Sequence, residues 1–201
     1  MKFTQLLNEK GSIIRKMMLN QFAFSLFGIF VATPFSGNIC IFAGVFSLLF
    51  YLFVVGFAIL DDAQKDRIAF NAGRKPYLNA FVGMKYAYIS FIPGILLTAL
   101  YTVLSFVLKA GNTFTFILGI INKYALSGEI LGIDVGLTNY TYDAINNIRV
   151  STAPEAVIFM SQHGIFQLIF ALAIPALCGL IYYLGYAGIV SVNTTESSEN
   201  K

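Results

Sequence analysis

The stretch LDDAQKDRIAFNAGRKPYLNAFVGMKY, Leu60–Tyr86, decides the fold of this chain. It contains eight of the chain's 23 charged residues, which are 13 basic and 10 acidic. The runs on either side of it, 39–60 and 86–108, carry no charge. A helix of about 20 apolar residues crosses a bilayer. Two such runs joined by a charged connection indicate two transmembrane helices with a turn in water between them.

The composition extends this interpretation to the whole chain. The 201 residues are 57% hydrophobic and only 11% charged, whereas a soluble domain carries about 25% charge. Two further uncharged runs lie at about 17–35 and 165–190. We therefore predict an all-α integral membrane protein. A single domain, 1–190, would have spans at about 17–35, 39–60, 86–108 and 165–190, an outer loop at 109–155, and a disordered tail at 191–201.

The distribution of basic residues predicts the orientation. Four spans place the N-terminus, the 61–85 connection and the C-terminal tail on one side of the membrane, together with most of the Lys and Arg residues. Lys109, Lys123 and Arg149 are the three basic residues on the other side. Because short loops rich in Lys and Arg stay in the cytoplasm, we expect both termini to be cytoplasmic.

The charged connection has helical signals of its own. Asp61 and Lys65 are four residues apart, which favours an ion pair on a helix that continues into water. Gly73 is placed to end that helix, and Pro76 to begin the next one. The connection is therefore a helical hairpin that sets topology or, alternatively, a docking site for a partner protein or acidic lipids. The residues of that candidate site are Asp61, Asp62, Asp66, Arg74 and Lys75.

The outer segment is predicted to form a cap packed on the bundle. The run 110–122 is too short for an ordinary span, so it extends the third helix or forms an interfacial or re-entrant piece. Gly128, Gly132 and Gly136 are interpreted as parts of loops and short helices. Thr152 and Glu155 match a capping box, which predicts a helix from about Ala153 to Gly164.

None of the four predicted spans contains Asp, Glu, Lys or Arg. Ionisable groups at bilayer depth mark proton relays and ion-coupled transport, so their lack in the spans argues against a proton-coupled antiporter. Pro93 and Pro175 lie inside the third and fourth spans and are candidate helix kinks. Such kinks serve packing alone or, as in transporters, line a cavity.

Three segments carry a resemblance to known proteins: DDAQKDRIAFNAGRK, the span opening GMKYAYISFIPG, and the last span ending CGLIYYLGYAGI. Over about Leu60–Ile189 the chain resembles a loose group of small bacterial four-helix membrane proteins that has no assigned activity. The resemblance implies the four-helix architecture and a bacterial inner membrane. It implies the role of no individual residue.

Two classes of function remain. The first is a non-catalytic membrane subunit that binds or regulates a partner complex, with the bilayer and another membrane or cytoplasmic protein as its partners. The alternative is a small transporter or substrate-binding component for an uncharged or hydrophobic compound. The sequence has no recognisable nucleophile–base pair, zinc motif or phosphate-binding loop, so we expect no enzyme activity and no cofactor or metal. Nucleic acid is not an expected partner.

Overall fold

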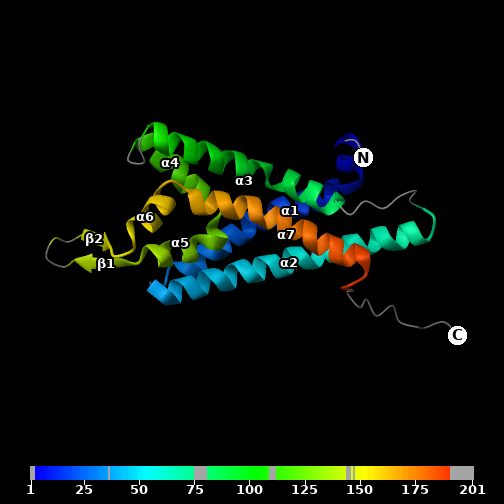
Figure 1. The fold of residues 1–201 in the computed structure, drawn as a ribbon, viewed down its shortest axis with the longest axis horizontal. Helices are drawn as coiled ribbons and strands as arrows, with labels where there is room; N and C mark the ends of the chain where they lie inside the picture. The colour runs from blue at the N-terminus through cyan, green and yellow to red at the C-terminus, as the bar shows by residue number, and fades with distance from the viewer. Residues whose placement is uncertain are drawn as a thin grey trace.

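A computed structural model describes residues 3–35, 37–74, 81–108, 112–143, 146 and 148–190. Four long helices lie side by side along the longest axis of the molecule (Figure 1). They are α1 (Phe3–Ala32), α2 (Gly37–Asn71), α3 (Val82–Val107) and α7 (Ile165–Ala187). The shorter elements are α4 (Thr113–Ile121), the π-helical turn η1 (Asn122–Leu126), the 3-10 turn η2 (Gly128–Ile130), α5 (Leu131–Thr138), β1 (Tyr140–Asp143), β2 (Ile148–Ser151) and α6 (Glu155–Gln162).

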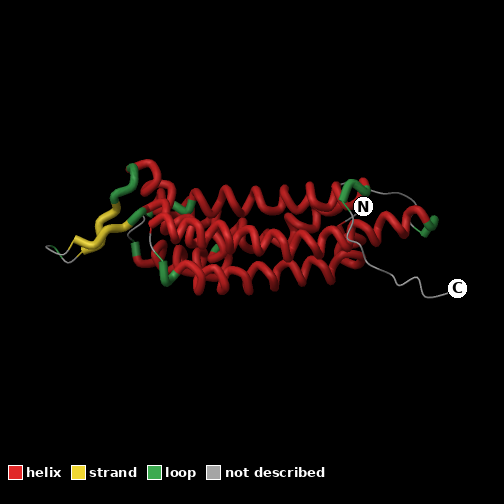
Figure 2. The backbone as a smooth tube through the Cα atoms, turned by 90° about the horizontal axis from the view of Figure 1, so that it is seen from below, coloured by secondary structure: helices red, strands yellow, loops and turns green. Residues whose placement is uncertain are grey.

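The two ends of the bundle differ in what they carry. The start of α1, the end of α2, the start of α3 and the end of α7 lie at one end, which we call the N-terminal end. The strands, α4 and α6 lie at the opposite end, the hairpin end (Figure 1), where Figure 2 also shows the strands in yellow. The first residues of α1 and the last residues of α7 thus lie at the same end as the last residues of α2. The placement of both termini in the cytoplasm stays a prediction.

Three helices, α2, α3 and α7, are long and apolar enough to cross a membrane. Their outer faces are apolar: on α2 the side chains of Phe42, Phe46, Phe53 and Phe57 are all exposed. Exposed apolar surface of this extent marks contact with lipid or protein rather than water. The all-helical membrane architecture is thus supported.

The predicted first span lies in α1, which is not among the helices apolar enough to pass as spans. The polar side chains of Gln21 and Ser25 interrupt its apolar half, and both are buried. Leu19, Phe22 and Phe30 are exposed on the same helix. The polar residues therefore face the protein and the apolar ones face outward, and four spans with both termini on one side remain a prediction.

The segment from Thr113 to Thr138 is the main departure from a simple four-helix bundle. Its two halves, Thr113–Leu126 and Gly128–Thr138, are bent by 86° around a break at Ser127. Together the halves are long and apolar enough to count as a broken span or a re-entrant loop. Among the alternatives predicted for the run 110–122, the re-entrant piece fits this geometry, and α4 is an element of its own from Thr113.

Close backbone contacts hold this broken segment against α1 and α2. A Cβ atom on Gly28 of α1 would lie 2.1 Å from the carbonyl oxygen of Gly128, and one on Gly44 of α2 would lie 2.4 Å from the backbone nitrogen of Ile133. A Cβ on Gly132 would lie 2.6 Å from the carbonyl oxygen of Cys40. Small residues of this kind let helices approach closely inside a membrane.

The predicted capping box at Thr152 and Glu155 is wrong. α6 begins at Glu155 after Pro154, and no side chain caps it. The Thr152 hydroxyl instead donates to the carbonyl oxygen of Asn139, at 2.9 Å. Asn139 ends α5 in the left-handed conformation, and β1 and β2 then form an antiparallel hairpin that the sequence analysis did not predict.

The helix end and the ion pair predicted in the charged connection are both present. α2 ends at Asn71, and Gly73 adopts a φ of +70°, a conformation that glycine adopts without steric cost. The predicted pair between Asp61 and Lys65 has an oxygen–nitrogen distance of 2.7 Å. Pro76 lies outside the described residues. α3 continues through Pro93 and α7 through Pro175.

Candidate functional site: two buried polar clusters

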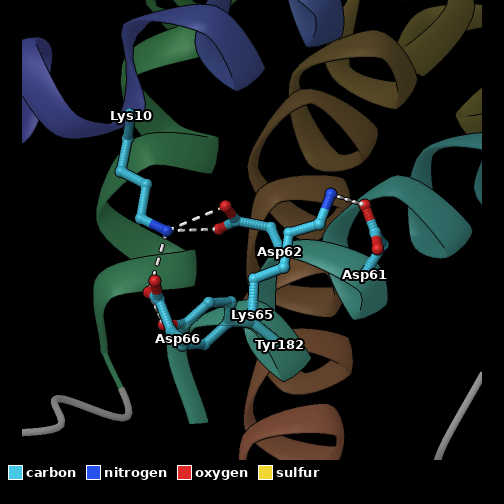
Figure 3. A network of polar contacts seen from close by, with 6 residues as sticks. All are labelled: Lys10, Asp61, Asp62, Lys65, Asp66 and Tyr182. Carbon is cyan, nitrogen blue, oxygen red and sulfur yellow. Dashed lines mark hydrogen bonds and ion pairs between the residues drawn. The ribbon is translucent and has the colours of Figure 1, made fainter. Parts of the chain in front are cut away.

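The first polar cluster joins three helices near the N-terminal end and is called the Lys10 cluster. It consists of Lys10 from α1, Asp62 and Asp66 from α2, and Tyr182 from α7 (Figure 3). Lys10 Nζ lies 2.7 Å from Asp62 Oδ2 and 2.8 Å from Asp66 Oδ2. The Tyr182 hydroxyl donates to Asp66 Oδ2 at 2.7 Å.

Burial makes these contacts important for the structure. The Lys10 side chain is only 5% exposed, and those of Asp62 and Asp66 are 19% and 11% exposed. Charges taken out of water lose hydration, which is recovered only when each has close partners of opposite charge. The Lys10 cluster therefore fixes the beginning of α1 against α2 and α7 in one geometry.

The structure divides the predicted docking residues into separate groups. Asp62 and Asp66 point into the Lys10 cluster, whereas Asp61 pairs with Lys65 on the outer side (Figure 3). Arg74 is exposed beyond the end of α2, and Lys75 lies outside the described residues. A docking role for these five residues stays a prediction. The described geometry favours Asp61 over Asp62 and Asp66 as a residue that meets a partner.

Lys10 and Tyr182 were not predicted as site residues. The spacing of Asp62 and Asp66, four residues apart, was a signal that both carboxylates share one face of a helix. Nothing in the sequence shows which of the basic residues meets that face, because Lys10 is 52 residues away from Asp62.

A surface groove lies beside the Lys10 cluster, between α1 and α2. Its volume is about 220 Å³. It is lined by Glu9, Ser12, Ile13, Lys16, Ala58, Asp61, Asp62 and Lys65. Side chains of both signs therefore border one concave surface, and the Lys10–Asp62 ion pair holds its two walls together.

The second polar cluster surrounds the break in the Thr113–Thr138 segment and is called the Glu129 cluster. Its side chains are all buried except that of Lys123, which is partly buried. Its members are Gln21, Ser25, Thr98, Asn122, Lys123, Ser127, Glu129, Asp134 and Gln167. They come from α1, α3, the broken segment and α7, so the cluster joins four parts of the bundle.

Side chains from α1 satisfy the backbone at the break. Gln21 Nε2 donates to the carbonyl oxygen of Leu126 at 3.3 Å, and the Ser25 hydroxyl donates to that of Tyr124 at 2.9 Å. The Ser25 hydroxyl also accepts from the backbone N–H of Gly128 at 2.7 Å. The last carbonyls of a helix have no partner within the helix. The side chains of α1 therefore supply the hydrogen bonds that the backbone loses at the break.

A buried ion pair lies on one side of the break. Lys123 Nζ is 2.9 Å from Asp134 Oδ2, and Gln167 Nε2 donates to the same oxygen at 2.9 Å. This pair joins the two halves of the broken segment and connects them to α7. Because an ionised carboxylate only accepts hydrogen bonds, it fixes the Gln167 amide with its nitrogen toward Asp134 and its oxygen directed elsewhere.

Glu129 and Gln167 border a small cavity next to that ion pair. Its volume is about 10 Å³, which is the least space that holds one water-sized species. Both side chains are 2% exposed. Glu129 Oε2 and Gln167 Oε1 are each buried without a hydrogen-bond partner among the described residues. Two buried oxygens without a hydrogen-bond partner thus belong to residues that border the same cavity.

The Glu129 cluster changes one argument made from the sequence. The four uncharged runs indeed lack ionisable residues, but the broken segment brings Lys123, Glu129 and Asp134 into the bundle. The lack of ionisable residues in the four runs therefore no longer counts against a proton-coupled antiporter. In the part of the chain that the structure describes, no three His, Cys, Asp or Glu side chains gather to hold a metal ion.

The fold and the two clusters define a helical membrane protein with a polar interior at a broken helix. No family model, curated protein or solved structure matches the chain.

Proposed function

We propose that the protein is a non-catalytic membrane subunit that docks a polar segment of a partner protein in the groove between α1 and α2. The observation that carries the proposal is this groove of about 220 Å³ with charged residues on both walls. We further propose a bacterial inner membrane, with the N-terminal end of the bundle in the cytoplasm, because that end holds most of the basic residues.

The groove has properties that suit a protein partner. Lys16 and Lys65 supply positive charge and Glu9 and Asp61 negative charge, so a partner presenting both signs in a fixed order is selected over a uniformly charged one. The Asp61–Lys65 pair is exposed, and exposed pairs contribute about 0–1 kcal/mol to stability. These two side chains are thus free to exchange partners at little cost to the fold.

Docking predicts that the rim of the groove controls what co-purifies with the protein. We expect the double variant Asp61→Asn, Lys65→Gln to lose a protein that co-purifies with the wild type in mild detergent, with Tm nearly unchanged. The effect should be larger at low salt, because charges at a surface are screened over about 10 Å at 0.1 M ionic strength. The measurement is quantitative mass spectrometry of the purified material at two salt concentrations.

Arg74→Gln is the matched control, because Arg74 is exposed near the end of α2 but does not line the groove. It should leave the co-purifying protein in place and reduce affinity for anionic lipid vesicles by about 1 kcal/mol. If the rim variant retains the same protein in the same amount as Arg74→Gln does, the groove is not the docking site.

The orientation is tested separately with single cysteines. After Cys40 and Cys178 are replaced, we expect a cysteine at Asn146 to react with an impermeant thiol reagent in intact cells. A cysteine at Ala72 should react only after the cells are broken, because the exposed residues Ala72 and Asn146 would then face opposite sides of the membrane. Labelling of Ala72→Cys in intact cells would overturn the proposed orientation. Ser198 in the C-terminal tail offers a further position, outside the described residues.

The transporter alternative takes second place. The cavity at the Glu129 cluster, about 10 Å³, has room for one water-sized species, which is far too small for an uncharged organic compound. Pro93 is exposed and Pro175 is buried. The helices continue through both prolines, and neither proline lines the cavity at the Glu129 cluster.

A further inference from the structure

We infer that the cavity beside Glu129 is a binding site for one small alkali-metal cation, Na⁺ or the similarly small Li⁺. Glu129 is the charged ligand and the Gln167 side-chain oxygen is a neutral one. This site lies in the broken segment and does not depend on the docking proposed for the α1–α2 groove.

The ionisable side chains of the Glu129 cluster favour one additional cation. The Glu129 cluster contains one basic side chain, Lys123, and two carboxylates, Glu129 and Asp134. Lys123 is 2.9 Å from Asp134, so an ionised Glu129 carboxylate would have no ion-pair partner among the described residues of the cluster. A buried charge is costly unless it is paired. One additional positive charge at the cavity would neutralise the cluster.

The oxygen atoms of the residues that border the cavity also suit a cation. Asp134 accepts from Gln167 Nε2 at 2.9 Å, which leaves Gln167 Oε1 as the atom without a partner. Glu129 Oε2 is likewise without a hydrogen-bond partner among the described residues, and both residues border the same cavity. Carboxylate and amide oxygens are the ligands of hard cations. The hydroxyls of Thr98 and Ser127, also in the cavity lining, are further oxygen ligands.

The break in the Thr113–Thr138 segment lies where a helix end favours a positive charge. The half ending at Leu126 directs its C-terminal carbonyls toward the break, where the helix dipole favours a positive charge. In discontinuous membrane helices, C-terminal helix ends take part in coordinating Na⁺. A volume of about 10 Å³ admits one dehydrated ion. A divalent ion is disfavoured because, within the described ranges of the chain, no three Asp, Glu, His or Cys side chains gather.

The test uses the full chain in mild detergent at constant pH and ionic strength. We expect NaCl or LiCl to raise Tm above its value in choline chloride, saturably, by about 5 °C or more at 100 times the apparent Kd. Radioactive ²²Na⁺ should bind to the wild-type protein with a stoichiometry near one and be displaced by Li⁺ but not by choline.

Glu129→Gln should abolish both the Tm shift and the ²²Na⁺ binding while matching or exceeding the wild-type Tm in choline, because it removes the unpaired buried charge. Asp61→Asn, the same chemical change at the exposed pair of the N-terminal end, should retain both signals. Equal Tm values in Na⁺ and choline with no ²²Na⁺ binding by the wild type would overturn the inference, whether or not the variant folds. An undiminished Na⁺ effect in Glu129→Gln would overturn it as well.

Discussion

Replacing Lys10 with Met should lower the free energy of unfolding by about 3–5 kcal/mol, the range for breaking a buried ion pair by removing one partner. Met has a similar length and keeps the apolar contacts of the lysine stem. It leaves Asp62 and Asp66, whose side chains are 19% and 11% exposed, without their common cation. The measurement is denaturant unfolding of the purified protein in a mild detergent, followed by circular dichroism.

Two controls separate the effect of breaking the buried ion pairs from the effect of removing a lysine charge. Lys65→Met removes a lysine from the exposed pair with Asp61 and should cost about 1 kcal/mol or less. The triple variant Lys10→Met, Asp62→Asn, Asp66→Asn removes the stranded negative charges and should recover most of the stability lost in Lys10→Met. If Lys10→Met costs no more than Lys65→Met, the Lys10 cluster does not fix α1 to the bundle.

The sequence predicted those parts of the fold that depend on local signals. The apolar runs matched α2, α3 and α7, and Gly73 marked the end of α2 because its left-handed backbone is a local requirement. The Asp61–Lys65 pair followed from a spacing of four residues on one helix. Each of these features is decided by residues that are close in the sequence, within one continuous run or about one helical turn of each other.

The parts that depend on distant contacts were missed. Thr152 donates to Asn139, 13 residues earlier, and therefore does not cap α6. Lys123, Glu129 and Asp134 looked like loop charges because the run before them was too short to be a span. Their burial follows from contacts of the broken segment with α1 and α2.

A usable signal for that segment was present in the sequence. Gly128, Gly132 and Gly136 are spaced four residues apart, which is the small-residue pattern of close helix contacts in membranes. They were interpreted as parts of loops and short helices from the Gly and Asn content of the segment, and Gly132 and Gly136 do lie in the short helix α5. Glycines at intervals of four beside a short apolar run indicate a packed, broken helix better than a loop. The side chains of Gln21 and Ser25 of α1 donate hydrogen bonds to the backbone at this break.

Gly28 of α1 makes the closest of these contacts, and its replacement by Ala should have the second large effect on stability. The added Cβ would lie 2.1 Å from the Gly128 carbonyl oxygen and 2.6 Å from the Cα of Glu129. These are backbone atoms, which have no rotamer in which to move aside. We expect Gly28→Ala to lower the free energy of unfolding by about 3 kcal/mol, at the upper end of the usual cost of overpacking.

Gly11→Ala is the matched control in the same helix, because a Cβ there meets nothing within 4 Å. Alanine stabilises a helix relative to glycine by about 0.5–1 kcal/mol, so this variant should unfold at a higher denaturant concentration than the wild type. The two substitutions are chemically identical and differ only in what lies beside them. If Gly28→Ala lowers the free energy of unfolding and Gly11→Ala raises it, the cost of Gly28→Ala comes from the contact between α1 and the break. A stabilising Gly28→Ala would show that α1 does not approach the broken segment at that distance.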